Sequence, residues 1–141
     1  MMMRSFILLL LAAPLGFAAP VPKELKQTDE QRIVGKWEMV VYYRNGTDAG
    51  PQTEHWLLEK GGRASIINPK AMVPESAITY KLTAGNGFDW QRSDSLRVGI
   101  YRLDGNTLKL AMGEWDVRPT ELKPGAGCSY CEFRRVKTEG K

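Results

Sequence analysis

The chain has little of what metal centres, redox enzymes and disulfide scaffolds are built from, since its 141 residues include two cysteines and one histidine. A four-cysteine zinc site needs a second cysteine pair, and the single histidine, His55, is a poor substitute for one. A hydrolytic triad needs a nucleophile, a base and an orienting group, and His55 is the one histidine available as a base. We therefore expect no metal site, no cofactor, no catalytic residues and no enzymatic activity.

The chain also lacks a strong excess of charge of one sign. Its formal net charge is +4, and the basic residues are scattered singly or in pairs, most densely at Arg134-Arg135. Nucleic-acid-binding proteins usually concentrate such residues in a stripe with aromatic residues between them. We therefore expect no nucleic-acid partner, and we expect the protein to be a monomer.

The N-terminal segment has the pattern of a secretory signal peptide. Arg4 precedes an apolar run over residues 6–13, and Gly16 and Ala18 place small residues at the cleavage positions. The apolar run is too short to span a bilayer, so we expect no transmembrane segment. The pattern predicts an exported protein, periplasmic or extracellular, that is cleaved after Ala18.

The rest of the chain predicts one domain over residues 28–137. Residues 19–27 are charged and contain prolines, which indicates a flexible leader, and residues 138–141 are expected to form a disordered tail. Thr28 and Gln31 have the spacing of a capping box, which predicts a short helix that ends before Gly35.

The segment from Gly35 to Arg44 predicts the first and most buried strand. It is rich in aromatic and β-branched residues and stops at the turn signal Asn45-Gly46. Side chains alternate along a strand, so one face is expected to carry Trp37, Met39, Val41 and Tyr43.

Seven further segments alternate in the same way and are separated by turn signals. Sequential hairpins favour a meander, and closing the meander removes exposed strand edges. The pattern predicts an all-β fold, a small eight-stranded antiparallel up-and-down barrel with a short N-terminal helix, with a Greek-key sandwich as the second possibility. The seven expected strands are residues 55–60, 63–67, 77–83, 88–92, 96–103, 107–112 and 128–136.

Two features resemble the lipocalins. Gly35-Lys36-Trp37 directly follows the expected helix and matches the lipocalin Gly-x-Trp motif. Arg135, near the end of the last expected strand, matches the arginine that packs over that tryptophan in lipocalins. The resemblance implies a lipocalin-like barrel in which Gly35, Trp37 and Arg135 form the structural closure, although the middle lipocalin motif is not identifiable here.

A second resemblance covers most of the domain, from about Arg32 to Lys137. The segment from Gly99 to Leu110, and Arg118-Pro119-Thr120-Glu121 after it, are similar to segments of a secreted lipocalin-like domain family. That family is abundant in planctomycete bacteria and has no assigned function. The resemblance implies a bacterial exported protein and a barrel fold, and it implies no chemistry.

Cys128 and Cys131 are compatible with three chemical states. A disulfide between them requires a bend, because residues three apart in a strand are separated by about 10 Å and a bridge needs less than about 7 Å. Gly125 and Gly127 make such a bend feasible. The two cysteines can instead be reduced strand residues, or they can form a redox or metal-carrying pair.

Aromatic residues on the inward positions are the candidates for a ligand site. They can line an apolar pocket, or they can fill the barrel, since eight strands enclose little space. The candidate ligand-binding residues are Tyr43, Trp56, Tyr80 and Trp90.

Three functions follow from these expectations. The first is an exported lipocalin-like binding module for a small apolar or amphipathic ligand. The second is a structural or protein-interaction domain of the cell envelope with a filled core and no ligand. The third is a thiol-redox or metal-carrying protein that uses Cys128 and Cys131.

Overall fold

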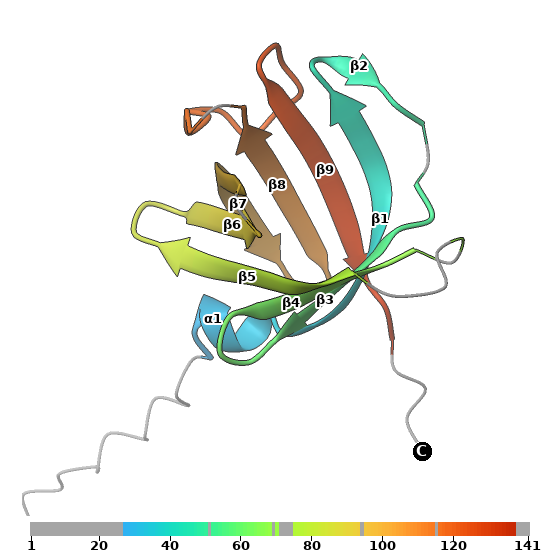
Figure 1. Cartoon of the computed structure of the whole chain (residues 1–141), viewed down its shortest axis with the longest axis vertical. Helices are drawn as coiled ribbons and strands as arrows, with labels where there is room; N and C mark the ends of the chain where they lie inside the picture. The colour runs from blue at the N-terminus through green and yellow to red at the C-terminus, as the bar shows by residue number, and fades with distance from the viewer. Residues whose placement is uncertain are drawn as a thin grey trace, which may run out of the picture.

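The structure is a computed structural model, and it contains one antiparallel sheet with a short helix at one end (Figure 1). The expected signal peptide, its cleavage site at Ala18, most of the leader and the tail at 138–141 lie outside the described part of the chain. That described part is residues 27–50, 52–68, 70, 75–93, 95–114 and 116–137.

The described elements agree with the expected ones to within about two residues and include one strand that was not expected. In chain order they are α1 (Asp29–Arg32), β1 (Gly35–Arg44), β2 (Thr47–Asp48), β3 (His55–Glu59), β4 (Arg63–Ile67), β5 (Glu75–Thr83), β6 (Gly87–Arg92), β7 (Ser95–Asp104), β8 (Thr107–Gly113) and β9 (Cys128–Arg135).

The sheet closes on itself. From β3 to β9 each strand pairs antiparallel with the next one in the chain, and β1 pairs with both β3 and β9. The short strand β2 pairs only with the end of β1, beyond the turn at Asn45-Gly46. The remaining eight strands form a closed up-and-down barrel, which confirms the predicted fold and excludes the Greek-key sandwich.

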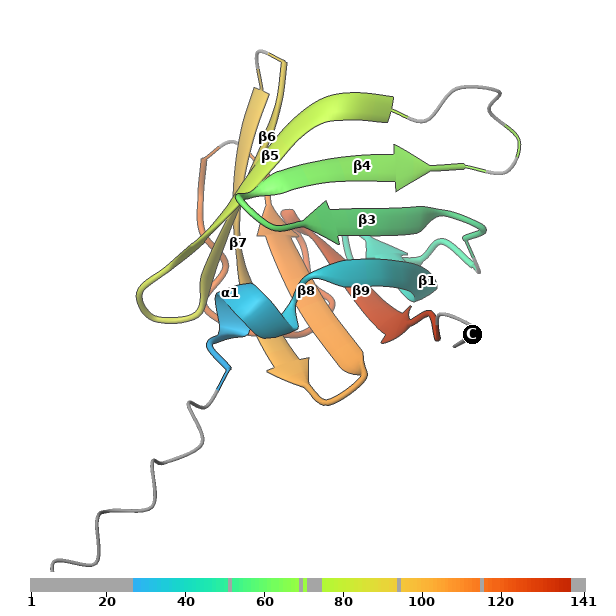
Figure 2. The same cartoon turned by 90° about the horizontal axis from the view of Figure 1, so that it is seen from below.

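Helix α1 covers the end of the barrel at which β1 begins (Figure 2). The predicted capping box is present: the Gln31 amide donates to Thr28 Oγ1, and the Thr28 amide donates to the Gln31 side chain. The Tyr101 hydroxyl donates to Asp29 Oδ2 at 2.7 Å, and Ile33 after the helix is fully buried. These contacts fix α1 against the barrel interior.

The half of the interior next to α1 is filled. Its largest fully buried side chains belong to one continuous hydrophobic cluster. They are Trp37, Phe88, Phe133, Ile33, Leu58, Ile78, Leu108 and Leu110. The hollow lined by Trp56 and Trp90 lies toward the opposite end.

A bulge in β1 reverses which residues of that strand face inward. The pairing of β1 with β9 shifts between Met39 and Val41, so that Tyr42 lies opposite Cys131 and Tyr43 lies opposite Tyr130. Directly paired residues point to the same side of a sheet, and Cys131 belongs to the core. Tyr42 therefore faces the interior, and the prediction that Val41 and Tyr43 face inward is wrong.

Candidate functional site

A hollow of about 200 Å³ lies inside the barrel at the end away from α1. We call it the barrel-mouth pocket. Its floor is apolar and is formed by Met39, Trp56, Ile66, Trp90, Met112 and Cys131. Its rim is polar and is formed by Tyr42, Gln52, Glu54, Arg92, Arg97 and Ser129. An apolar floor with a few polar groups around it is typical of a site for a small molecule.

Two stacked indoles form the centre of the floor. The ring centroids of Trp56 and Trp90 are 4.3 Å apart and the rings are inclined by 20°. Trp56 also contacts Phe133, at 4.6 Å between centroids, which ties the floor to the filled half of the core. The two indoles are 7% and 3% exposed, so their positions are set by packing and not by solvent.

Trp56 has a polar atom with no partner. Its Nε1 is buried and makes no hydrogen bond within the described residues, and such an orphaned donor costs stability. The carboxyl of Glu54 lines the same pocket and interacts with this N–H, but the two groups do not form a hydrogen bond of normal geometry. Burial raises the pKa of Glu54, and the Trp56 N–H and the charge of Arg92 offset part of that rise.

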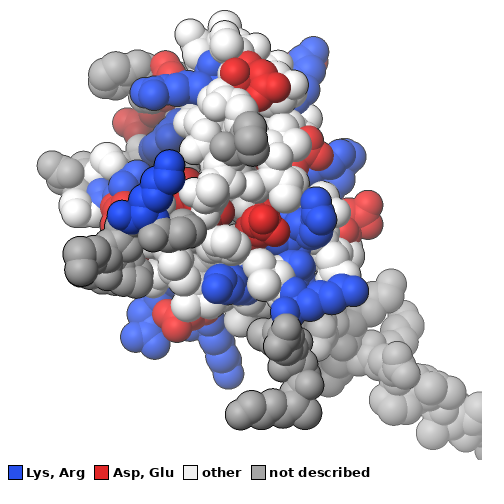
Figure 3. Space-filling model, turned by 90° about the vertical axis from the view of Figure 1, so that its right-hand side faces the viewer, with Lys and Arg blue, Asp and Glu red and all other residues white. Residues whose placement is uncertain are grey.

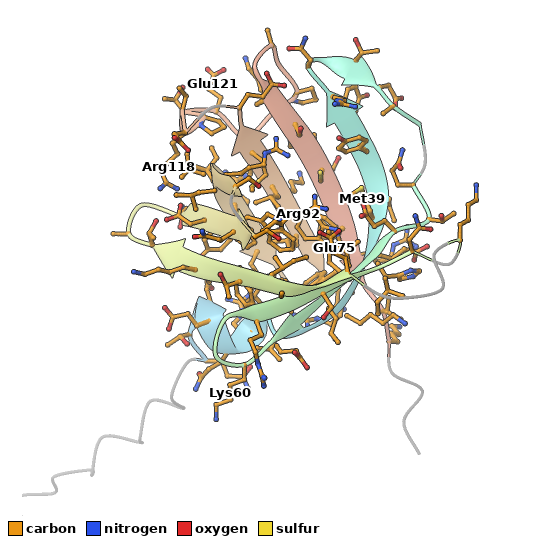
Figure 4. All side chains as sticks on the ribbon, viewed as in Figure 1. Met39, Lys60, Glu75, Arg92, Arg118 and Glu121 are labelled. Atoms are coloured by element: carbon orange, nitrogen blue, oxygen red, sulfur yellow. The ribbon has the colours of Figure 1, made fainter. Side chains whose placement is uncertain are left out.

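The two rim arginines differ in their partners. Arg92 forms a bidentate pair with Glu75, with Nε–Oε1 at 2.7 Å and Nη2–Oε2 at 2.5 Å. Figure 4 shows this pair far from Arg118 and Glu121, and Arg92 lines the same pocket as Met39. Arg97 is half-buried and donates to Ser129 Oγ at 3.1 Å. None of the ion pairs formed by the described residues includes Arg97, so no described carboxylate lies within ion-pair distance of its guanidinium.

A second, more open hollow of about 580 Å³ adjoins the barrel-mouth pocket. The two share Tyr42, Arg97 and Ser129, so Arg97 lies where the interior meets the outside. Glu114 and Asp116 also line this hollow. A bound molecule can therefore extend outward past Arg97.

The structure brings together two of the four predicted ligand-binding residues. Trp56 and Trp90 meet in the pocket floor. Tyr80 lies toward the α1 end, where its ring stacks with Phe88 and its hydroxyl donates to the Glu59 carbonyl at 2.9 Å. Tyr43 lies on the outer face, with its ring centroid 6.4 Å from that of Tyr130. Tyr43 and Tyr80 are therefore not part of the pocket.

The predicted closure residues lie together at the other end of the barrel. The Arg135 guanidinium lies over the Trp37 ring and donates to the carbonyls of Val34 and Arg32. Gly35 has φ +145°, and a Cβ built there would lie 2.7 Å from Arg135 Nη1. This geometry is the one implied by the lipocalin resemblance.

The suggested disulfide between Cys128 and Cys131 is wrong, because both thiols are free and buried. β9 is regular here, and residues three apart in a strand point to opposite faces. Cys131 faces the core, while Cys128 Sγ lies beside the Gly125 carbonyl of the preceding loop. Burial raises the pKa of Cys131 to about 12, which suppresses thiolate chemistry.

None of the six rim residues was predicted from the sequence. Arg97 lies four residues before Tyr101, and Glu54 lies two residues before Trp56. Side chains an even number of residues apart in an extended segment point to the same side, so alternation predicts that both Arg97 and Glu54 face inward. Arg92 follows Trp90 by two residues in the same way. Tyr42 gave no such signal, because the bulge that turns it inward depends on the partner strand.

The described residues add neither a metal-binding cluster nor a membrane-spanning helix to this site. They contain no group of three or more His, Cys, Asp or Glu side chains placed to hold a metal ion. Acidic and basic side chains are interspersed on the face seen in Figure 3. Among the described helices, none has the length and apolar character needed to cross a bilayer.

The fold and the pocket define a class of protein, a closed eight-stranded antiparallel barrel with one filled end and one hollow end. No model of a known protein family matches the chain, and no curated protein matches it either. The resemblance to lipocalins and to the planctomycete family therefore stays a prediction.

Proposed function

We propose that this protein is an exported lipocalin-like binding module that takes a small amphipathic ligand in the barrel-mouth pocket. The observation that supports it best is the unpartnered Nε1 of Trp56 in the pocket floor. A buried donor without an acceptor is costly in a filled core, and a bound ligand removes that cost. The apolar floor can contact the hydrophobic part of such a ligand, and Arg97 can bind its polar group.

Export is the other part of the proposal, and its support comes from the sequence of residues 1–18. If the protein is exported, the mature chain recovered from its host begins at Ala19. Mass spectrometry of the exported fraction tests this, and a chain that still begins at Met1 there contradicts it.

Ligand binding is tested by titration of the purified protein with fatty acids, haem, isoprenoids and aromatic metabolites, followed by tryptophan fluorescence. Trp56 and Trp90 line the pocket, so a bound ligand is expected to change their emission. A variant with a filled pocket, Ser129→Phe, is expected to abolish the change. Glu132→Phe places the same ring on the outer face of the same strand and is expected to leave the change intact.

The second candidate is a structural or interaction domain of the cell envelope. The small volume of the pocket, about 200 Å³, and the filled half of the core favour it. No saturable change with any compound, together with identical behaviour of Ser129→Phe and the parent protein, supports this candidate over the first.

A further inference from the structure

The donor and acceptor at the pocket floor match one functional group. Trp56 Nε1 is an unpartnered donor, and the carboxyl of Glu54 is an acceptor beside it. A hydroxyl is the small group that accepts one hydrogen bond and donates another. A ligand hydroxyl within reach of both groups can accept a hydrogen bond from Trp56 Nε1 and donate one to the Glu54 carboxyl.

The rim matches a second functional group. Arg97 forms no ion pair with a described carboxylate, and among the described residues its guanidinium donates to Ser129 Oγ. The neighbouring Arg92 is already occupied by both oxygens of Glu75. A guanidinium presents its donors in a planar fork that fits a carboxylate. An arginine in this position therefore favours a ligand with a carboxylate at its outer end.

The space between these two ends limits the rest of the ligand. A protein cavity of about 150 Å³ is known to accept benzene, and the pocket measures about 200 Å³. One aromatic ring with two small substituents is therefore near the limit for the pocket alone. The stacked pair of Trp56 and Trp90 offers that ring flat aromatic neighbours. Trp90 lies directly opposite Arg97 on the next strand, which places ring and carboxylate sites side by side.

We propose that the barrel-mouth pocket binds small hydroxylated aromatic carboxylates. The carboxylate pairs with Arg97 and Ser129, the ring lies against Trp56 and Trp90, and the hydroxyl lies between Trp56 Nε1 and Glu54. This inference rests on the proposed binding function and names the chemical class of the ligand.

Isothermal titration calorimetry with four compounds tests the contributions of the hydroxyl, the carboxylate and the aromatic ring to binding. 4-Hydroxybenzoate carries both groups, benzoate lacks the hydroxyl, 4-hydroxybenzamide lacks the charge, and octanoate lacks the ring. A buried polar group left unpaired by an analogue weakens binding strongly. We expect 4-hydroxybenzoate to bind about tenfold or more tightly than each of the other three, the factor for one hydrogen bond to a buried or charged group.

Two variants assign the groups to residues. Trp56→Phe keeps an aromatic ring and removes the N–H, so it is expected to abolish the preference for 4-hydroxybenzoate over benzoate while benzoate still binds. Arg97→Gln is expected to abolish the preference over 4-hydroxybenzamide. Arg102→Gln is the matched control, because Arg102 lies on the outer face of the same strand and is exposed. Retained benzoate or amide binding shows that each variant is folded.

These titrations distinguish failure of the proposed ligand class from failure of the proposed binding function. Saturable binding of octanoate or 4-hydroxybenzamide as tight as that of 4-hydroxybenzoate overturns the ligand class and leaves the binding function standing. The same holds if none of the four probes binds while another compound of the broad panel does. No saturable binding of any compound overturns both proposals.

Discussion

The guanidinium of Arg135 lies over the indole of Trp37, with Cζ 4.3 Å from the ring centroid, and joins the last strand of the barrel to the first. The same guanidinium donates to two carbonyls, that of Arg32 at the end of α1 and that of Val34 just before β1. Trp37 Nε1 donates to the carbonyl of Ile33 at 2.8 Å. The helix, the first strand and the last strand therefore meet in one bonded cluster.

Trp37→Ala is expected to lower the free energy of unfolding by about 3–5 kcal/mol, the range for truncating a large buried aromatic side chain. Because Arg135 packs on this ring, a double-mutant cycle with Arg135→Ala is expected to give a coupling of about 0.5 kcal/mol or more. Urea denaturation of the four proteins measures both quantities. Strictly additive effects contradict a stabilising contact between the two side chains.

Gly35→Ala is expected to lower stability by about 1–3 kcal/mol, because φ +145° disfavours any side chain and the new Cβ meets Arg135. Gly61→Ala is the control, since Gly61 also has positive φ but no atom within 4 Å of its added Cβ. Thermal or urea unfolding compares the two. In an Arg135→Ala background the cost of Gly35→Ala is expected to fall toward that of Gly61→Ala, and an unchanged cost argues against the close approach.

Both cysteines are expected to resist alkylation in the folded protein. Cys128 and Cys131 are 8% and 3% exposed, and the raised pKa of Cys131 keeps that thiol protonated near neutral pH. Intact-mass measurement after iodoacetamide treatment is expected to show two labels only after unfolding. A protein that takes up no label even when unfolded without a reductant contains a disulfide and contradicts the structure.

Stability is expected to depend on the ionisation of Glu54. Burial raises the pKa of Glu54 above its ordinary value of 4.5, so the folded protein holds this proton more tightly than the unfolded chain does. The resulting stabilisation is complete below about pH 4.5 and is lost as the pH rises through the folded-state pKa. The groups that act on Glu54 are Arg92, Glu75 and Trp56.

Glu54→Gln removes this titration. Urea denaturation between pH 4 and pH 8 is therefore expected to show the variant becoming more stable relative to the parent protein as the pH rises. Glu59→Gln, at the exposed end of the adjoining strand β3, is the control. A difference that stays constant with pH, or one that shrinks as the pH rises, contradicts the raised pKa.

Arg118→Ala is expected to loosen the loop between β8 and β9. Arg118 donates to the Gly99 carbonyl at 2.7 Å and to Asp89 at 2.8 Å, and these bonds hold the loop against the barrel wall. The pair is partly exposed, so we expect a loss of about 1–2 kcal/mol. Hydrogen exchange is expected to rise in residues 116–127 and to stay unchanged in β3 and β4. Arg102→Ala, which has no such bonds, is the control, and a uniform rise across the barrel contradicts a local role.

Local sequence patterns were sufficient for most of the fold. The alternation from Gly35 to Met39, the turn glycines and the Thr28–Gln31 capping box act over a few residues, so their geometry follows from nearby chemistry. These local patterns do not reveal that Trp37 and Arg135, 98 residues apart, are partners. That prediction came from the lipocalin resemblance. The contact itself is a result of barrel closure.

The pocket depended on contacts that no local pattern contains. Pairing of β1 with β9 creates the bulge after Met39, which moves Tyr42 inward and Tyr43 outward against a strict period of two. Helix α1 covers one end of the barrel and core side chains fill that half, so two residues with the same inward parity lie in different places, Tyr80 in the filled half and Trp56 beside the pocket. Alternation decides which side of a strand a residue faces, and only the closed barrel decides what it meets there.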